Sequence, residues 1–256
     1  MSSRLSKVID RIRGRGLATL SYPRDFLRFR RLAAGHERWR VPTLRDAHPC
    51  LADRTSLTTF DRHYVYHPAW ALRVLLETKP QEHVDISSIL VFATMASAVV
   101  PVRFYDFRPA PLVLPQLSCG RADLLALPFA DRSIASLSCM HVIEHIGLGR
   151  YGDPIDANGD LKALRELERV LAPGGTLLVV VPVGRPRVCF NAHRVYDVDS
   201  IVRAMPSLTL HSLSLIPDAP TPDQYDAGII EGADAELVRR QRYGCGCFRF
   251  ERPTHG

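Results

Sequence analysis

Three aspartates end successive predicted strands in the first half of the chain. Asp85, Asp106 and Asp123 each follow a short apolar run, and ligands of doubly wound α/β sheets bind where the carboxyl ends of parallel strands meet. Asp106 follows Asp85 by 21 residues, the position from which a carboxylate accepts both hydroxyl protons of a ribose. Asp123 is placed to accept from an adenine amino group while Leu124 covers the ring. Each aspartate alone is better explained as a solvated turn or helix cap, but the spacing of all three favours a nucleotide-like ligand.

A second set of polar residues lies just after two later strands. His141, Glu144 and His145 follow one strand, and His193 with Arg194 follows the next. Histidine exchanges a proton near neutral pH, which makes these residues candidates for acid–base chemistry. The order H-x-x-E-H resembles a metal signature only superficially, because His141 and His145 straddle a strand-to-loop transition instead of one helical turn. We therefore predict no metal site from this motif.

The elements that position these residues alternate between apolar strands and amphipathic helices. We predict helices over 63–79, 88–99, 161–171 and 197–205, and strands over 83–87, 102–106, 117–124, 134–140, 176–181, 208–216 and 246–252. A second strand so soon after the first implies a right-handed crossover and a parallel sheet. The continuous apolar run at 176–181 is typical of a central strand covered on both faces. The sequence predicts a doubly wound, mostly parallel, Rossmann-like α/β sheet.

The bulk composition limits the chain to one core. Its 256 residues, 46% of them hydrophobic, suffice for one sizeable α/β domain with an extension. We see no secretory leader, and the longest apolar stretch, 89–102, is too short to span a bilayer, so we expect a cytoplasmic protein. The six cysteines form no C-x-x-C pair, which favours reduced thiols. Cys245-Gly-Cys247 is suggestive, but we identify no partners for it.

The basic charge belongs to an N-terminal arm, residues 1–59, ahead of a main domain at 60–256. Residues 1–45 hold 12 Arg or Lys and 3 acids, a net +9, so that the remainder of a +6 chain carries −3. Apolar residues at helical spacing over 5–12 predict a short basic amphipathic helix, and 24–45 reads as an extension wrapped on the domain. The helix either packs on the main domain or rests on an anionic membrane surface. Nucleic acid is the least favoured partner, because charge alone does not identify one.

Three motifs carry a family resemblance: A-D-L-L-A-L-P-F at 122–129, H-V-I-E-H at 141–145 and R-V-L-A-P-G-G at 169–175. In them the chain resembles class I S-adenosylmethionine-dependent methyltransferases of the type 11 group. The segments H-V-D-I-S-S, S-C-M-H-V-I-E-H-I-G-L-G-R-Y-G-D-P-I-D, V-P-V-G and F-N-A-H-R-V-Y resemble, more narrowly, a bacterial family of unknown function associated with surface-polysaccharide synthesis. The resemblance covers residues 60–205 and implies a methyltransferase-like fold with S-adenosylmethionine as cofactor.

The turn after the first strand departs from this family. Such methyltransferases continue the opening acid with Gly-x-Gly, whereas Asp85 is followed here by Ile86, Ser87 and Ser88, which puts a side chain where close approach needs none. Either Ser87 leaves the cofactor site usable, with Ser88 capping the next helix and offering backbone N–H groups, or the pocket is closed and the fold is vestigial. The missing G-x-G-x-x-G disfavours a nicotinamide-dependent oxidoreductase.

For a methyltransferase, the resemblance puts His141, Glu144 and His145 next to the sulfonium of the cofactor. Methyl transfer to a hydroxyl needs positioning and removal of a proton. His193 with Arg194 is our preferred catalytic or acceptor-orienting pair, and His145 is a base or a packed wall residue. The polar, glycine-rich loop 147–156 is either a ligand-binding lid or a turn-rich connection.

The sequence thus predicts a methyltransferase that acts on a hydroxyl of a glycan or small molecule in cell-envelope polysaccharide synthesis. Its basic arm would hold it at the inner face of the membrane. The alternative is a catalytically inactive methyltransferase-like module that scaffolds or regulates a polysaccharide assembly. The two differ in whether the strand ends form an open site that binds adenosine.

Overall fold

The structure is a computed structural model in which residues 19–36, 40–51, 53, 58, 60–218 and 228–254 are described. The chain divides into two compact units, Met1–Phe60 and Asp61–Gly256. In the first unit residues 19–33 are helical, where we expected only an extension, and Leu44–Asp46 forms the short helix η1. The amphipathic helix predicted over 5–12 lies outside the described residues.

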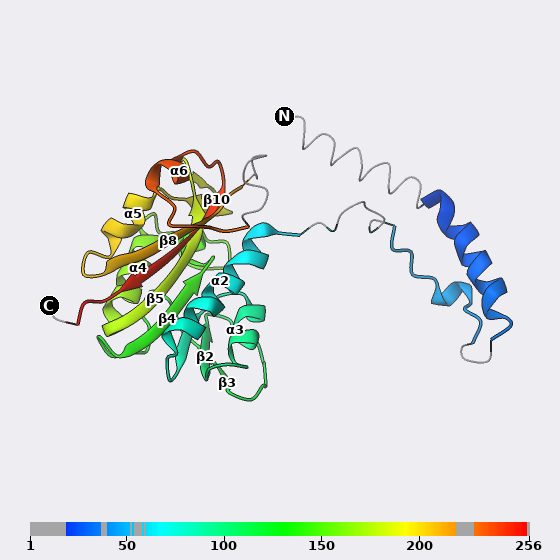
Figure 1. Cartoon of the computed structure of the whole chain (residues 1–256), viewed down its shortest axis with the longest axis horizontal. Helices are drawn as coiled ribbons and strands as arrows, with labels where there is room; N and C mark the ends of the chain where they lie inside the picture. Colours follow the sequence, from blue (N-terminus) through cyan, green and yellow to red (C-terminus); the bar gives the residue numbers. More distant parts are fainter. Residues whose placement is uncertain are drawn as a thin grey trace. The chain divides into compact units, whose positions relative to one another are not determined.

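The second unit is built on an eight-stranded sheet with the order β3-β2-β1-β4-β5-β10-β8-β9 (Figure 1). Its strands are β1 (His83–Ile86), β2 (Val102–Asp106), β3 (Leu117–Arg121), β4 (Ile134–Met140), β5 (Leu171–Val183), β8 (Thr209–Ile216), β9 (Ile230–Glu231) and β10 (Gly244–Glu251). The five strands from β3 to β5 run parallel, and β10 is antiparallel to both β5 and β8. The predicted doubly wound, mostly parallel sheet is confirmed.

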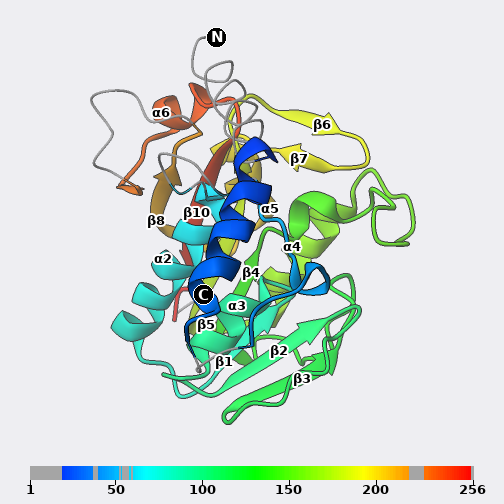
Figure 2. The ribbon, with the colours of Figure 1, turned by 90° about the vertical axis from the view of Figure 1, so that its right-hand side faces the viewer.

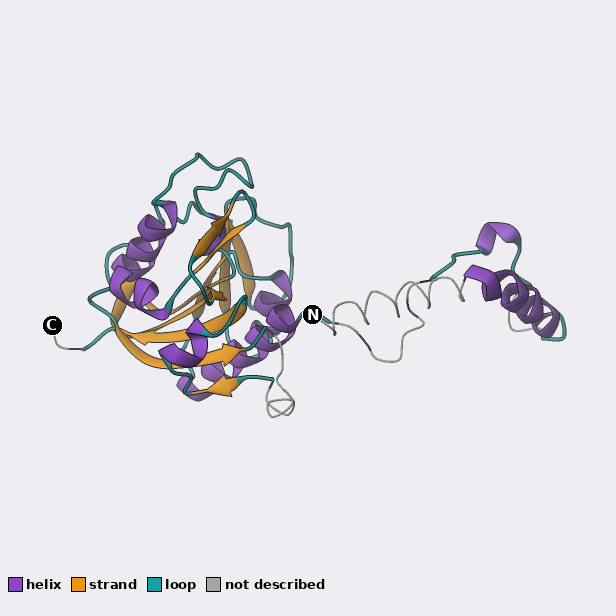
Figure 3. Cartoon of the chain, turned by 90° about the horizontal axis from the view of Figure 1, so that it is seen from above, coloured by secondary structure: helices purple, strands orange, loops and turns teal. Residues whose placement is uncertain are grey.

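Helices cover both faces of this sheet (Figures 1 and 3). One face carries α2 (Arg62–Thr78) and α3 (Leu90–Ala96), and the other carries α4 (Gly159–Val170), α5 (Val198–Ala204) and α6 (Ala235–Arg239). The side chains of β5 alternate between the two cores: Val179 packs with α4 and α5, and Val180 packs with α2 and α3. This two-sided burial explains the unbroken apolar run. No helix in the described ranges is long and apolar enough to cross a membrane.

β5 begins earlier than predicted. The sequence predicted a helix over 161–171 and a strand from 176, with Pro173, Gly174 and Gly175 between the two. Instead α4 ends at Val170 and the strand starts at the next residue. Gly174 does have a positive φ of 72°, but its N–H donates to the carbonyl of Arg252, whose own N–H donates to Gly175. Pairing with the chain beyond β10 therefore draws this segment into the sheet.

A small hairpin was not predicted. β6 (Arg187–Cys189) and β7 (His193–Val195) form a separate two-stranded antiparallel sheet, drawn in yellow in Figure 2. Just after β7, the N–H of Tyr196 donates to the carbonyl of Pro182 at 3.0 Å. This contact returns the hairpin to the carboxyl end of β5, so that residues of β7 reach the edge of the sheet where ligands bind in this fold class.

His83 joins β1 to β4 inside the sheet. Its side chain has no exposed surface, and its two ring nitrogens lie 2.8 Å and 2.9 Å from the hydroxyls of Ser136 and Ser138. Burial lowers the pKa of His83 from 6.5 to about 3, because the charged imidazolium would lose its hydration. The histidine therefore stays neutral in the folded protein throughout the physiological pH range.

Replacing His83 should change both the stability and its pH dependence. Below pH 6.5 the unfolded chain binds a proton at this residue, while the folded chain does not until about pH 3. This single group thus lowers the free energy of unfolding by about 1.4 kcal/mol per pH unit as the pH falls between these values. His83→Leu should remove that slope and cost about 1–3 kcal/mol at pH 7.5 for each serine hydroxyl left without a partner.

Urea unfolding of the wild type and the variant at pH 7.5 and pH 5 measures both effects. Ser138→Ala is the matched control, since it breaks one of the hydrogen bonds and keeps the titrating ring. It should lose stability and retain the full slope. An unchanged slope in His83→Leu would contradict the prediction.

Candidate functional site

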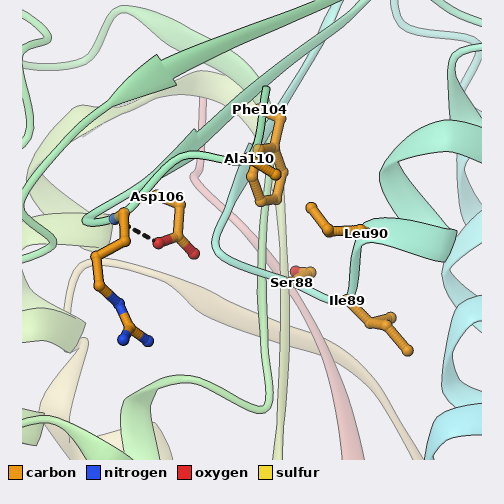
Figure 4. A pocket seen from close by; sticks show the side chains of 7 residues that line it. Ser88, Ile89, Leu90, Phe104, Asp106 and Ala110 are labelled. Carbon is orange, nitrogen blue, oxygen red and sulfur yellow. Dashed lines mark hydrogen bonds between the residues drawn. The ribbon is translucent and has the colours of Figure 1, made fainter. Parts of the chain in front are cut away.

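A pocket of about 350 Å³ opens beside the carboxyl ends of β1 and β2 (Figure 4). Its lining consists of Ser88, Ile89, Leu90, Phe104, Asp106, Arg108 and Ala110. Figure 4 shows Asp106 on the opposite side of the pocket from Ser88 and Leu90. The carboxylate is held by the N–H of Arg108, which donates to Oδ1 at 2.7 Å. An anchored carboxylate beside the apolar side chains of Ile89, Leu90 and Phe104 is suited to a sugar that bears a flat ring.

Asp85 supports the turn that borders this pocket and is not in its lining. The carboxyl group has no exposed surface; Oδ1 accepts the N–H of Ser88 at 3.1 Å, and Oδ2 has no partner. Burial raises the pKa of Asp85 to about 7. The hydroxyl of Ser88 accepts the N–H of Met140 at 3.1 Å and does not cap α3, whose N-cap is Ile89. The expectation that Ser88 caps this helix is therefore wrong. Ser88 instead ties the turn after β1 to β4.

Ser87 adopts the backbone conformation that glycine favours. Its φ is +56°, in the left-handed region that costs a residue with a side chain about 1–2 kcal/mol. Its N–H donates to the carbonyl of Tyr105 at 2.7 Å, and its hydroxyl lies 3.3 Å from the same oxygen. The turn thus keeps a path typical of glycine although serine occupies it, and the pocket beside it is open.

Asp123 and Leu124 reach the same edge of the sheet through the backbone. The N–H of Ala122 donates to the carbonyl of Asp106 at 3.1 Å, so Asp123 lies just beyond the end of β2. Its exposed side chain accepts the N–H of Leu125 at 2.9 Å. The Leu124 side chain is buried in the core that contacts α4, outside the pocket lining.

Polar and aromatic side chains gather at the carboxyl end of β4, in what we call the histidine cluster. Its members are His63, His67, His141, Glu144, His145, His193, Tyr243 and Cys245. His141 directly follows β4, and Cys245 is the second residue of β10. Because β10 is antiparallel to β5, its first residues lie at the carboxyl ends of the parallel strands. α2 contributes His63 and His67 from its first two turns.

His141 lies at the centre of this cluster. Nδ1 is 2.8 Å from Oε1 of Glu144, and Nε2 is 3.5 Å from Sγ of Cys245. The ring of His63 stacks on that of His141, with centroids 5.3 Å apart and planes 15° apart. His67 meets the same ring edge-on at 5.1 Å. The side chain predicted to lie beside a cofactor is thus enclosed by protein groups.

Burial keeps the imidazole rings of the cluster uncharged at neutral pH. It lowers the pKa of both His63 and His141 to about 4 and that of His67 to about 3. Burial raises the pKa of Glu144 to about 7, and it raises the pKa of the Cys245 thiol well above its usual value. Removal from water disfavours whichever form carries a charge. At neutral pH the folded protein therefore presents unprotonated imidazole nitrogens in this region.

His145 holds the loop before β7 against the segment after β4. Nδ1 lies 2.6 Å from the carbonyl of Ala192, to which it donates, and the ring packs edge-on against Tyr151. Only 9% of the residue is exposed. The structure assigns His145 the contacts of a packed wall residue.

Arg194 and His193, neighbours on β7, have different surroundings. The guanidinium of Arg194 is buried, donates to the carbonyl of Ile146 at 2.7 Å and lies 3.5 Å from the carboxylate of Asp160. His193 is half-buried, and its ring lies 4.9 Å from that of Tyr243. Partial burial lowers the pKa of His193. Arg194 thus ties the hairpin to the loop after β4, while His193 remains partly accessible.

The acids of loop 147–156 bind groups of the loop itself and of α4. The carboxylate of Asp153 accepts N–H groups from Gly147, Gly149 and Tyr151 at 2.8–3.3 Å, and that of Asp156 pairs with Lys162 at 2.7 Å. The bonds of Asp153 fold the segment onto itself, and the ion pair of Asp156 ties it to α4. They support the interpretation of the loop as a turn-rich connection.

Several members of the histidine cluster were not predicted from the sequence. His63 and His67 are four residues apart in the predicted helix 63–79, which puts them on one face, and this spacing was an available signal. Cys245 was noted without partners. Its proximity to His141, 104 residues away, depends on the antiparallel position of β10 between β5 and β8.

The chain was compared with protein families, curated proteins and solved structures. A family model described as "Caenorhabditis protein of unknown function, DUF268" matches residues 131–206. No curated protein matches the chain. Among solved structures, the N-methyltransferase NodS of Bradyrhizobium japonicum is similar at 15% identity, with a TM-score of 0.53 over 75% of this chain and 98% of that one. The same enzyme in complex with S-adenosylhomocysteine is similar at 16% identity, with a TM-score of 0.50 over 73% and 85%.

The 1,6-didemethyltoxoflavin-N1-methyltransferase of Burkholderia thailandensis, also solved with S-adenosylhomocysteine, is similar at 12% identity. The TM-score is 0.51, over 73% of this chain and 79% of that one. At these identities the likeness concerns the fold. The second unit of this protein therefore has the class I methyltransferase fold.

Proposed function

We propose that this protein is an S-adenosylmethionine-dependent methyltransferase that holds the adenosine part of its cofactor in the pocket beside Asp106. The observation that carries the proposal is the Asp106 carboxylate, fixed in a pocket of about 350 Å³ at the end of β2. A carboxylate there can accept both ribose hydroxyls. The similar structures with bound S-adenosylhomocysteine support the same assignment.

The remaining cofactor contacts follow from the strand ends. Asp123 would accept from the adenine amino group. The methionine part would run past the turn of Asp85 and Ser87 toward the carboxyl end of β4. The positive φ of Ser87 supports this path, since it leaves the backbone in the form that a glycine turn would take.

For the acceptor we propose a hydroxyl of an envelope glycan or a similar small molecule. His193 would take the hydroxyl proton, because its partly exposed ring is carried to the carboxyl end of β5 by the hairpin. His145 and Arg194 would position the segments around it through Ala192 and Ile146. The basic arm, net +9 over residues 1–45, would keep the enzyme at the inner membrane face, near lipid-linked intermediates.

Removing the Asp106 carboxylate should weaken cofactor binding. Hydrogen bonds to a charged group contribute about 1.5–3 kcal/mol, so Asp106→Ala should lower the affinity for S-adenosylhomocysteine about 10- to 100-fold. Isothermal titration calorimetry measures this directly. Asp199→Ala, which removes an exposed carboxylate on α5, is the matched control and should bind as the wild type does. Absence of binding to the wild type at millimolar ligand would rule the proposal out.

Substitutions at Ser87 test the path of the turn. Ser87→Gly should raise the free energy of unfolding by up to about 1 kcal/mol, because the left-handed conformation costs glycine little, and it should retain S-adenosylhomocysteine binding. Ser87→Val should lower both stability and affinity, because a β-branched residue fits this conformation poorly. Denaturant unfolding and calorimetry on the two variants provide the measurements. Weaker binding by the glycine variant would show instead that the serine hydroxyl itself contacts the ligand.

Transfer and binding can be separated with methyl-labelled S-adenosylmethionine and a cell-envelope glycan fraction. A methyltransferase should label a hydroxyl of the glycan, and Asp106→Ala should reduce labelling in parallel with its loss of affinity, while Asp199→Ala should not. Cofactor binding without label transfer to any fraction would favour the alternative, a module that binds adenosine and scaffolds or regulates the assembly without catalysis.

A further inference from the structure

Three buried side chains from distant parts of the chain bring atoms that can bind a metal close together. One ring nitrogen each of His63 and His141 and the sulfur of Cys245 lie within 4.8 Å of one another. They come from the first turn of α2, the end of β4 and the start of β10. We propose that these residues form a binding site for a late first-row transition-metal ion, Zn²⁺ in the first instance.

The donor set favours this class of ion. Imidazole nitrogen and thiolate sulfur suit zinc and its neighbours, whereas Mg²⁺ and Ca²⁺ require oxygen ligands. In tetrahedral zinc sites the bond lengths to nitrogen and sulfur put these two atoms about 3.6 Å apart. The observed separation of His141 Nε2 and Cys245 Sγ is 3.5 Å. This pair therefore already has the spacing of two ligands on one ion.

The group behind His141 is the one that metal-bound histidines commonly use. Nδ1 of His141 lies 2.8 Å from Oε1 of the buried Glu144, and a carboxylate in this place fixes the ring orientation and leaves Nε2 for the metal. The H-x-x-E-H motif thus takes part in a site, although not as a pair of histidine ligands. Glu144 supports the ligand His141, and the second histidine comes from α2.

Two further atoms in this region are buried without a hydrogen-bond partner. These are Oε2 of Glu144 and Nε2 of His67, and the ring of His67 packs against that of His141. Such atoms are uncommon in folded proteins and call for an ion, a water molecule or another explanation. An ion on His141 would polarise its imidazole and strengthen the bond to Glu144. It would also place a positive charge close to the unpaired oxygen of Glu144.

Three protein ligands leave a tetrahedral ion one further position, for water or for an oxygen of a bound molecule. Binding requires Cys245 to lose its thiol proton to solvent, so the ion would convert the buried thiol to a thiolate. The inference does not depend on methyl transfer, because it is based on ligand atoms outside the lining of the Asp106 pocket. It can therefore hold or fail separately from the proposed function.

Metal content of the purified full-length protein tests the site. After dialysis with Zn²⁺ and removal of loosely bound ion, elemental analysis should find one zinc per chain. Replacement of zinc by Co²⁺ should produce a thiolate-to-cobalt charge-transfer band in the near ultraviolet. Cys245→Ser should abolish this band. His63→Gln and Glu144→Gln should lower the affinity for zinc, measured by competition with a chelating dye, and for Glu144→Gln the loss should be about 10- to 100-fold.

Cys247→Ser is the matched control, because this thiol is equally buried on the same strand and lies outside the ligand set. It should keep both the zinc and the charge-transfer band, and Mg²⁺ should not compete. Circular dichroism verifies that each variant is folded. Should Cys245→Ser fail to fold, His63→Gln carries the test. A wild type without stoichiometric metal, a cobalt complex without the thiolate band, or equal loss in Cys247→Ser would overturn the inference.

Discussion

Burial of the central strands on both faces is the constraint from which the rest of this structure follows. α2 and α3 cover one side and α4 and α5 the other. Polar side chains in the middle of β1, β4 and β5 therefore cannot form hydrogen bonds with bulk water. Polar side chains must then find partners inside the protein. His83 does so through the two serines of β4, and Asp85 through the N–H of Ser88. The polar groups left for chemistry lie where the parallel strands end.

That edge of the sheet has two regions with different chemistry. Beside β1 and β2 lies an open pocket in which an anchored carboxylate faces a partly apolar wall. Beside β4 and β10 lies the histidine cluster, which is closely packed and whose imidazole rings are neutral because burial penalises their charged form. The first region is suited to a neutral sugar and a ring, and the second to a cation that supplies the charge the cluster lacks. Ser88, which lines the pocket and bonds to Met140 just before His141, connects them.

The fold also determines which sequence candidates are free to act. Arg194 and His145 bind carbonyl oxygens of neighbouring loops, so their contacts hold the hairpin and the segment after β4 together. The carboxylate of Asp153 accepts N–H groups of its own loop and so holds that loop together. His193 differs because its ring is partly exposed beside Tyr243. Of the polar residues after β4 and β5, it has the accessibility that a proton acceptor requires.

The sequence by itself determined the alternating elements, the parallel half of the sheet and the edge at which Asp106 lies, because apolar periodicity and strand-end residues are local properties. β2 and β4 begin and end where their patterns predict. Tertiary structure alone decided the early start of β5, the short hairpin of β6 and β7, and the meeting of His63, His141 and Cys245. Each of these depends on contacts between distant segments, and such contacts leave no periodic signal in the sequence. At Pro173 to Gly175 the free energy of strand pairing outweighs the local preference of the residues.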